Sequence, residues 1–153
     1  MKDPLSSFRV LGQVPERERL GLLAYVEERT YEPGQILFDV GDESDELLFV
    51  IDGEVEVSSN GRRLCLLGRG DMIGGLSLTF VGRRQCSATA SGQVKVLTLD
   101  RSAYLRLRDE APLLALAVQE GVIRSLARAL SVTPVESLLD RESSTVDGTD
   151  AAD

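Results

Sequence analysis

The amino-acid sequence predicts a mostly β domain, of the sandwich, barrel or jelly-roll type, with helices at both ends. Ten of the fourteen glycines lie between residues 34 and 92, where they alternate with short β-type runs. Many short strands separated by turn signals are typical of these all-β architectures. The flanking segments instead carry proline and apolar residues at helical spacing, which predicts helices on either side of the strands.

The first predicted helix follows Pro15 and spans residues 16–29. Proline suits the first turn of a helix because its missing N–H would have no partner there. Leu20, Leu23 and Ala24 give this helix one apolar face. The sequence Glu-Pro-Gly at residues 32–34 is expected to end it.

Five short strands are predicted from alternating or continuous apolar residues. They are centred on residues 36–40, 47–51, 55–57, 86–90 and 94–99. Asp52-Gly53 and Asn60-Gly61 lie between such runs. These dipeptides favour two-residue hairpins because both central residues can adopt a positive φ.

Two further helices are predicted after the strands. Asp100 is expected to cap a short helix over residues 101–110, and Pro112 begins a longer one that reaches about Leu130. The longer helix carries a broad apolar stripe, with other apolar residues partly outside it. The stripe consists of Leu113, Leu116, Ala117, Ile123, Leu126, Ala127 and Leu130, and the residues partly outside it are Leu114, Val118 and Val122. Such a helix is expected to pack on its own barrel and on a second helix, and packing wholly on its own core is the alternative. Gly121 weakens the helix by ~1 kcal/mol relative to alanine and marks a bend or a close contact.

The composition excludes several kinds of site. The 153 residues include no histidine, which removes Ser-His-Asp and Cys-His catalysis and histidine-based metal sites. The formal net charge of −8 opposes binding to nucleic-acid phosphates. The densest basic cluster is large enough for one small anion only. It consists of Arg62, Arg63, Arg69, Arg83 and Arg84.

The chain divides into three predicted parts: an N-terminal segment (1–14), a single domain (15–131) and an acidic tail (132–153) that we expect to be disordered. No apolar run approaches the ~20 residues that span a bilayer, and the N-terminus does not resemble a signal peptide. We therefore expect a cytoplasmic protein without membrane insertion. Cys65 and Cys86 would then stay reduced, as buried thiols on strands.

Four short strings, in this order and at this spacing, resemble the cyclic nucleotide-binding domain family over about residues 15–130. They are residues 31–38 with Gly41-Asp42, residues 48–51 with 53–57, residues 70–74, and residues 99–101. The resemblance implies a double-stranded β-helix (jelly-roll) barrel with an N-terminal helix and a long C-terminal helix. It also implies a regulatory, non-enzymatic module that binds a cyclic nucleotide.

The third string resembles the entry to the family's phosphate-binding cassette. The family holds a cyclic phosphate on backbone N–H groups where a short helix begins, and on the fork of donors of one arginine. The resemblance carries this role to Gly74, Gly75, Leu76, Ser77, Arg84 and Gln85. Two positions depart from the pattern: Gly75 stands where a glutamate binds the ribose hydroxyl, and Gln85 where a small residue donates to the phosphate. Losing one such charge-assisted hydrogen bond costs about 1.5–3 kcal/mol, so binding is weakened or lost, or another anion is admitted.

Three functional hypotheses follow. In the first, cAMP, cGMP or a related phosphate binds without any cofactor, and residues 113–130 pass the signal on. In the second, the same fold is a ligand-independent dimerisation or docking module, with a homodimer formed through residues 113–130; Arg84 then lies in a solvated turn and Gly74-Gly75 is a plain tight turn. In the third, the chain is a transcription factor of the catabolite-activator type. That family adds a helix-turn-helix domain after the long helix, whereas a polar stretch of 22 residues with acidic character (132–153) follows here, so we expect no direct nucleic-acid binding.

Overall fold

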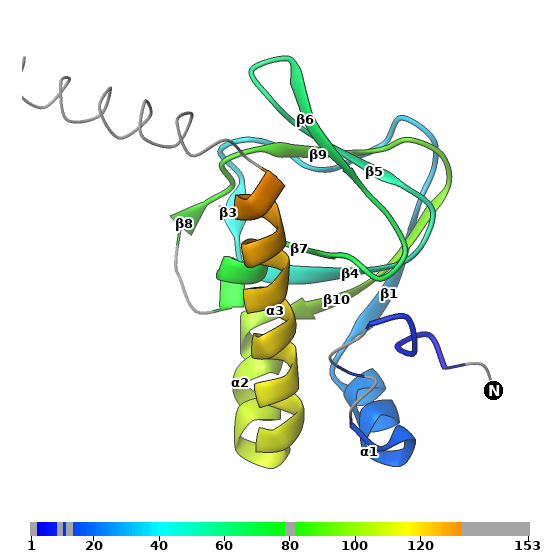
Figure 1. Ribbon diagram of the computed structural model, residues 1–153, viewed down its shortest axis with the longest axis vertical. Coiled ribbons are helices and arrows are strands. Elements are labelled where there is room, and N and C mark those ends of the chain that lie inside the picture. The colour runs from blue at the N-terminus through cyan, green and yellow to red at the C-terminus, as the bar shows by residue number, and fades with distance from the viewer. Residues whose placement is uncertain (1–2, 9–10, 12–13, 79–81, 133–153) are drawn as a thin grey trace, which may run out of the picture.

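The computed structural model describes residues 3–8, 11, 14–78 and 82–132. Ten strands lie between short N-terminal helical turns and two C-terminal helices in this part of the chain (Figure 1). The helical elements are α1 (Glu16–Leu20), the 3₁₀ turns η2 (Gly21–Ala24) and η3 (Gly75–Leu78), α2 (Arg101–Glu110) and α3 (Pro112–Val132). The strands are β1 (Glu27–Tyr31), β2 (Ile36–Phe38), β3 (Glu43–Ser44), β4 (Glu46–Asp52), β5 (Val55–Ser59), β6 (Arg62–Leu67), β7 (Met72–Ile73), β8 (Gly82–Arg83), β9 (Ser87–Ala90) and β10 (Val94–Asp100).

The strands form two four-stranded antiparallel sheets and a small two-stranded one. Their orders are β1-β10-β4-β7, β2-β9-β5-β6 and β3-β8. Successive strands thus move between sheets, as in a jelly roll, and α2 and α3 lie together beside the roll (Figure 1). The predicted fold class is confirmed.

The central strands β4 and β10 are buried on both faces. Leu47 and Phe49 of β4 point into a core shared with the helices, whereas Leu48 and Val50 point into the core inside the roll. Leu97 and Leu99 of β10 belong to the helix-side core, and Val94 and Val96 to the core of the roll. The continuous apolar run at 47–51 is explained by this double burial.

The N-terminal segment, which the sequence set apart from the domain, contributes to the helix-side core. Leu5, Phe8 and Leu11 are buried there, and the Phe8 ring meets the Phe49 ring edge to face at 5.3 Å. A largely buried ion pair of 2.6 Å joins Arg19 to Asp3. The segment is therefore held by both apolar packing and charge.

The prediction of a helix over residues 16–29 is wrong beyond its first turns. The α-helix ends at Leu20, a 3₁₀ turn follows to Ala24, and residues 27–31 form β1, which pairs with β10 along its whole length. The residues of β1 include Thr30 and Tyr31, which favour strands, and the open edge of β10 supplies their hydrogen bonds. Tertiary pairing overrides the weak helical periodicity here.

The helices after the strands begin where the sequence predicts. Asp100 caps α2, and its Oδ1 accepts a hydrogen bond of 2.7 Å from the Ala103 amide. None of the described helices is long and apolar enough to cross a bilayer. The predicted tail lies outside the described residues, apart from Val132, which ends α3.

The predicted apolar stripe of α3 faces mainly outward. The residues placed partly outside the stripe are in the core, together with two alanines: Leu114, Ala115, Ala117, Val118 and Val122. The exposed large apolar residues of α3 are Leu113, Leu116, Ile123 and Leu126, and the side chain of Leu130 lies outside the description. Because both faces of α3 carry apolar residues, the sequence pattern could not show which face is buried.

Gly121 marks a close contact between α3 and β7. A Cβ at this position would lie 2.7 Å from Met72 Cε and 2.9 Å from Met72 Sδ. The helix axis therefore approaches β7 at the one point where α3 has no side chain.

The two cysteines are free thiols, but they are not both buried on strands. Cys65 lies on β6 and is exposed, and Cys86 is half-buried just before β9. Desolvation raises the pKa of both thiols, and nearby Arg84 lowers that of Cys86 in part.

Candidate anion-binding site

A glycine bend lies between β7 and η3 and packs directly against Arg84. Gly74 has a φ of +80°, a conformation that other residues adopt only under strain. A Cβ at this position would lie 2.1 Å from Arg84 Nη1 and 3.1 Å from the Glu46 carbonyl oxygen. Glycine is thus required twice, for the backbone conformation and for the space that the guanidinium group occupies.

The Arg84 side chain is turned into the protein. Its residue is 7% exposed, and its guanidinium carbon lies 4.1 Å from the centre of the Phe38 ring. Nη1 donates to Ser77 Oγ at 3.1 Å, and Nη2 donates to the Glu46 carbonyl at 2.9 Å. The interpretation of Arg84 as part of a solvated turn is therefore wrong.

The Arg84 charge lacks a direct counter-charge. Both of its acceptors are neutral oxygens, its Nε has no hydrogen-bond partner, and the described residues provide no ion pair for it. Desolvation lowers the pKa of Arg84, and the carboxylates of Glu46, Asp45 and Asp42 act from farther away in the opposite direction. A guanidinium group remains charged in proteins, so this site holds a buried cation that an anion would stabilise.

Ser77 connects the bend to β3 and to α2. Its amide donates to the Gly74 carbonyl at 2.9 Å, and its hydroxyl is hydrogen-bonded to that of Ser44 as well as to Arg84. Its carbonyl accepts hydrogen bonds from Arg101 Nε at 3.1 Å and Nη2 at 2.7 Å. Arg101 Nη2 also donates to the Ser44 carbonyl at 2.9 Å. The first residue of α2 thus holds the 3₁₀ turn next to Arg84.

The structure brings together some of the six predicted site residues and leaves others apart. Gly74, Ser77 and Arg84 are in mutual contact, and the backbone of Gly75 and Leu76 forms the start of η3 beside them. Gln85 is exposed, and its side-chain nitrogen lies 3.5 Å from the Arg83 carbonyl, outside this group.

Four contributors were missed by the sequence analysis: Phe38, Ser44, the Glu46 carbonyl and Arg101. Only Arg101 carried a signal, as the residue that follows the Asp100 cap. The other three lie 38 or more residues before Arg84 in the chain, and only the fold brings them to it.

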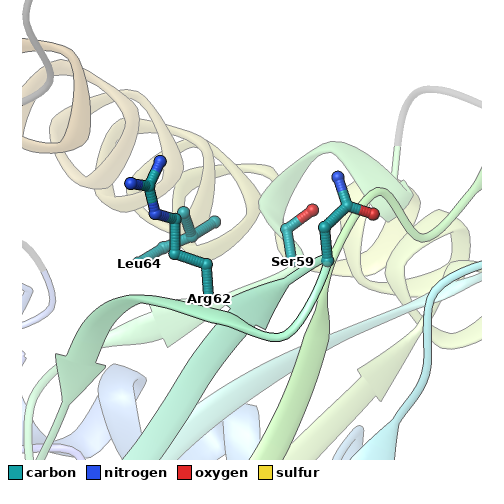
Figure 2. Close-up of a pocket in the computed structure, with 4 residues that line it drawn as sticks. Ser59, Arg62 and Leu64 are labelled. Atoms are coloured by element: carbon teal, nitrogen blue, oxygen red, sulfur yellow. The ribbon is translucent and has the colours of Figure 1, made fainter.

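Two cavities lie near this end of the roll. One, of about 280 Å³, is lined by Glu43, Ser44, Asp45, Gly82, Arg83 and Arg101. The other, of about 400 Å³, lies at the β5–β6 hairpin and is lined by Ser59, Asn60, Arg62 and Leu64. Figure 2 shows Ser59, Arg62 and Leu64 projecting from the same side of the hairpin.

Comparisons with known proteins show which family has this fold. The family model described as cyclic nucleotide-binding domain matches residues 28–111. The chain is 34% identical over 123 residues to the cyclic AMP receptor protein of Thermus thermophilus, which covers 77% of the chain and 56% of that protein. It is 32% identical over 106 residues to the cAMP-dependent protein kinase regulatory subunit of Eremothecium gossypii, covering 69% of the chain and 23% of that protein.

A solved structure has the same fold. The N-terminal domain of a transcriptional regulator from Streptomyces coelicolor superposes with a TM-score of 0.69 at 29% identity, covering 87% of the chain and 99% of that domain. The chain spans about half or less of the length of the two curated relatives. Since the family model covers more than half of the chain and the roll and glycine bend are in place, the chain belongs to the cyclic nucleotide-binding domain family.

Proposed function

We propose that this regulatory domain binds a cyclic nucleotide or a related phosphate, and that binding changes the position of α3. In this proposal Arg84 holds the phosphate together with the backbone of Gly75, Leu76 and Ser77. The observation that carries the proposal is the buried Arg84 guanidinium, which has an unpartnered Nε and no ion pair among the described residues. A buried unpaired charge is costly, and a phosphate is the anion that an arginine fork fits best.

When a ligand binds, its phosphate replaces two neutral hydrogen-bond acceptors of Arg84. Without ligand, the guanidinium donates to the Ser77 hydroxyl and the Glu46 carbonyl, which are neutral acceptors. A phosphate brings a full negative charge and can accept two parallel N–H bonds from the guanidinium, which two separate neutral oxygens do not offer, so it competes well for the same donors. Ser77 is then released from Arg84 and stays bonded to Ser44 and Arg101.

The ribose is expected to be held less tightly than in a domain with a glutamate in the cassette. Gly75 offers no carboxylate to a 2′-hydroxyl, and its place in η3 is next to the bend. We therefore propose that the binding free energy is less favourable by about 1.5–3 kcal/mol than at a site whose glutamate binds the 2′-hydroxyl. Neither cAMP nor cGMP is favoured by the residues at this position.

Two contacts connect the site to the helices. Arg101 joins the Ser77 carbonyl to the start of α2. Met72 of β7 lies two residues before Gly74 and packs against Gly121 of α3. A movement of the bend is thus applied to both helices, and we propose that α3 carries the signal to a partner.

A homodimer through residues 113–130 is a second proposal, supported by a separate observation. Leu113, Leu116 and Ile123 are between 56% and 68% exposed on one helix. They lie three and seven residues apart, as apolar positions of a coiled-coil seam do, and the seam position between Leu116 and Ile123 is Glu120. Such a face is stabilised when a second copy covers it, and dimerisation with or without ligand fits this surface.

The proposal assigns this domain no catalytic step and no direct contact with nucleic acid. Its charge of −8 repels phosphate backbones, and the basic residues at the bend suit a small anion. Two free thiols fit a reducing compartment such as the cytoplasm, which we propose as its location, without membrane insertion.

Isothermal titration calorimetry with cAMP and cGMP, up to millimolar ligand, tests the proposal. We expect measurable binding by the natural chain and a loss of about tenfold to a hundredfold in Arg84→Gln. Arg83→Gln is the matched control, because the exposed Arg83 side chain donates, among the described residues, only to the Gly41 carbonyl. The nucleotide affinity of this variant should stay within about twofold of that of the natural chain. Equal affinities of the natural chain and Arg84→Gln would contradict the proposal, as would absence of heat with both nucleotides and with the cyclic dinucleotides cyclic di-AMP and cyclic di-GMP.

A further inference from the structure

Arg62 lines a cavity at the β5–β6 hairpin, and its side chain has no hydrogen-bond or ion-pair partner in the part of the chain that the structure describes. Among the described residues, three arginines line the two cavities: Arg62, Arg83 and Arg101. Arg83 donates to the Gly41 carbonyl, and Arg101 donates to the Ser44 and Ser77 carbonyls. The Arg62 side chain makes no hydrogen bond or ion pair with the described residues, and among these it is the only charged side chain that lines the hairpin cavity. This cavity therefore has a charge to offer to a ligand.

The strand register places Arg62 on the inner face of the roll. Val55 and Val57 of β5 are buried inside the roll, so Ser59, two residues further on, faces the same way. Ser59 pairs with Arg62, whereas Ser58 pairs with Arg63. Directly paired residues lie on the same face of a sheet, so Arg62 faces inward and Arg63 outward. Figure 2 shows Arg62 and Ser59 on one side of the hairpin.

Arg62 and Arg84 lie at the same end of this sheet. Ser58 of β5 pairs with Ser87 of β9, and Arg84 precedes Ser87 by three residues. β5 lies between β6 and β9. The Arg84 guanidinium carbon lies 4.1 Å from the centre of the Phe38 ring, and Phe38 pairs with Ala88, which pairs with Val57 of β5, two residues before Ser59. Both arginine side chains thus lie at the same end of the roll, on the side of Phe38 and Val57, where one nucleotide-sized ligand can contact both.

We propose that the hairpin cavity is a second anion subsite and that the ligand of this domain carries two phosphate groups. The inference rests on the proposed function, since Arg84 holds the first phosphate. Arg62 holds the second, with the Ser59 hydroxyl and the Asn60 amide as further donors from the same cavity. A cyclic dinucleotide has this charge pattern.

The residue at position 75 agrees with a more strongly charged ligand. A glutamate there would repel a second phosphate, whereas Gly75 adds no negative charge to the site. Two cationic side chains and no facing carboxylate in the cassette favour a dianion over a monoanion. The same substitution that weakens ribose recognition thus favours a ligand with two phosphates.

The test is calorimetric titration of the natural chain with cAMP, cGMP, cyclic di-AMP and cyclic di-GMP. We expect at least one dinucleotide to bind about tenfold to a hundredfold more tightly than either mononucleotide, as one added charge-assisted contact allows. Arg62→Gln should remove this advantage and leave the mononucleotide affinities unchanged. Arg63→Gln, on the outer face of the same strand, is the matched control and should change no affinity by more than about twofold.

The outcomes separate the two proposals. Binding of cAMP or cGMP without tighter binding of a dinucleotide overturns the second subsite and leaves the proposed function standing. Tighter dinucleotide binding that Arg62→Gln and Arg63→Gln reduce equally also overturns it, because the effect would then be general attraction. If none of the four nucleotides binds, both proposals fail.

Discussion

Gly74→Ala tests whether the glycine bend exists to accommodate Arg84. Gly34 is the matched control: its φ of +83° is nearly that of Gly74 (+80°), but a Cβ at Gly34 meets no atom within 4 Å. Alanine in this backbone region costs about 1–2 kcal/mol at either position. At Gly74 the new methyl group also displaces Arg84 Nη1, which lies 2.1 Å away, from Ser77.

The two costs differ by the contact alone. Losing a hydrogen bond to a charged group adds about 1.5–3 kcal/mol, so Gly74→Ala should lower the free energy of unfolding by about 2.5–5 kcal/mol. Gly34→Ala should lower it by about 1–2 kcal/mol. Urea unfolding followed by far-UV circular dichroism measures both values, and the slope with urea should stay the same in each variant.

A double-mutant cycle with Arg84→Ala sharpens the test. When the guanidinium group is absent, the methyl group at position 74 meets no Nη1, and the cost of Gly74→Ala should fall toward that of Gly34→Ala, with only the 3.1 Å approach to the Glu46 carbonyl oxygen left. Equal losses for Gly74→Ala and Gly34→Ala in the natural background would refute the reasoning. So would a cost of Gly74→Ala that is unchanged when Arg84 is alanine.

Three further predictions concern the ligand, the link to α2 and the exposed face of α3. Gly75→Glu should raise the affinity for cAMP, measured by calorimetry, about tenfold to a hundredfold, because the glutamate supplies an acceptor for the 2′-hydroxyl. The affinity for 2′-deoxy-cAMP, which lacks that hydroxyl, should not rise. An equal gain for both nucleotides would show that the ribose is not involved. Arg101→Gln should lower the free energy of unfolding, measured in urea, by about 1–2 kcal/mol, because the Ser77 and Ser44 carbonyls lose a charged donor. Arg108→Gln, on the exposed side of α2, should leave the free energy of unfolding unchanged. Similar losses in both variants would contradict the link between Arg101 and the 3₁₀ turn η3. Ile123→Glu should convert the dimer into a monomer, as measured by sedimentation velocity. Leu105→Glu, which alters an exposed apolar residue on α2, should leave the dimer intact. A natural chain that is monomeric at all concentrations tested argues against the interface.

The fold was largely predictable because turns and caps are local. Gly53 and Gly61 take the positive φ that hairpin turns require, and Asp100 caps α2 as its position suggests. The errors occurred where distant partners decide. Residues 27–31 form a strand only because β10 has a free edge, and the buried face of α3 depends on where β7 lies.

The candidate site was predictable only in part, for the same reason. The resemblance led to Gly74 and Arg84, and these two residues do meet. The acceptors of Arg84 could not be predicted, since one is a main-chain oxygen of β4 and the other depends on the path of η3. The packing of the N-terminal segment was also missed by the sequence analysis. Leu5, Phe8 and Leu11 are apolar and spaced three residues apart, which indicates a buried face, but the segment is too short for this pattern to stand out.

The double burial of β4 and β10 has a consequence for how the molecule comes apart. Each strand supplies alternate side chains to two separate cores, so neither core can lose its order while the other persists. Amide protons of these two strands should therefore exchange with solvent last, and only when the whole domain opens. A shortened chain without α2 and α3 would expose much of the helix-side core, to which Leu47, Phe49, Leu97 and Leu99 belong and which the N-terminal segment covers only in part, and such a sheet should aggregate rather than persist as an independent roll.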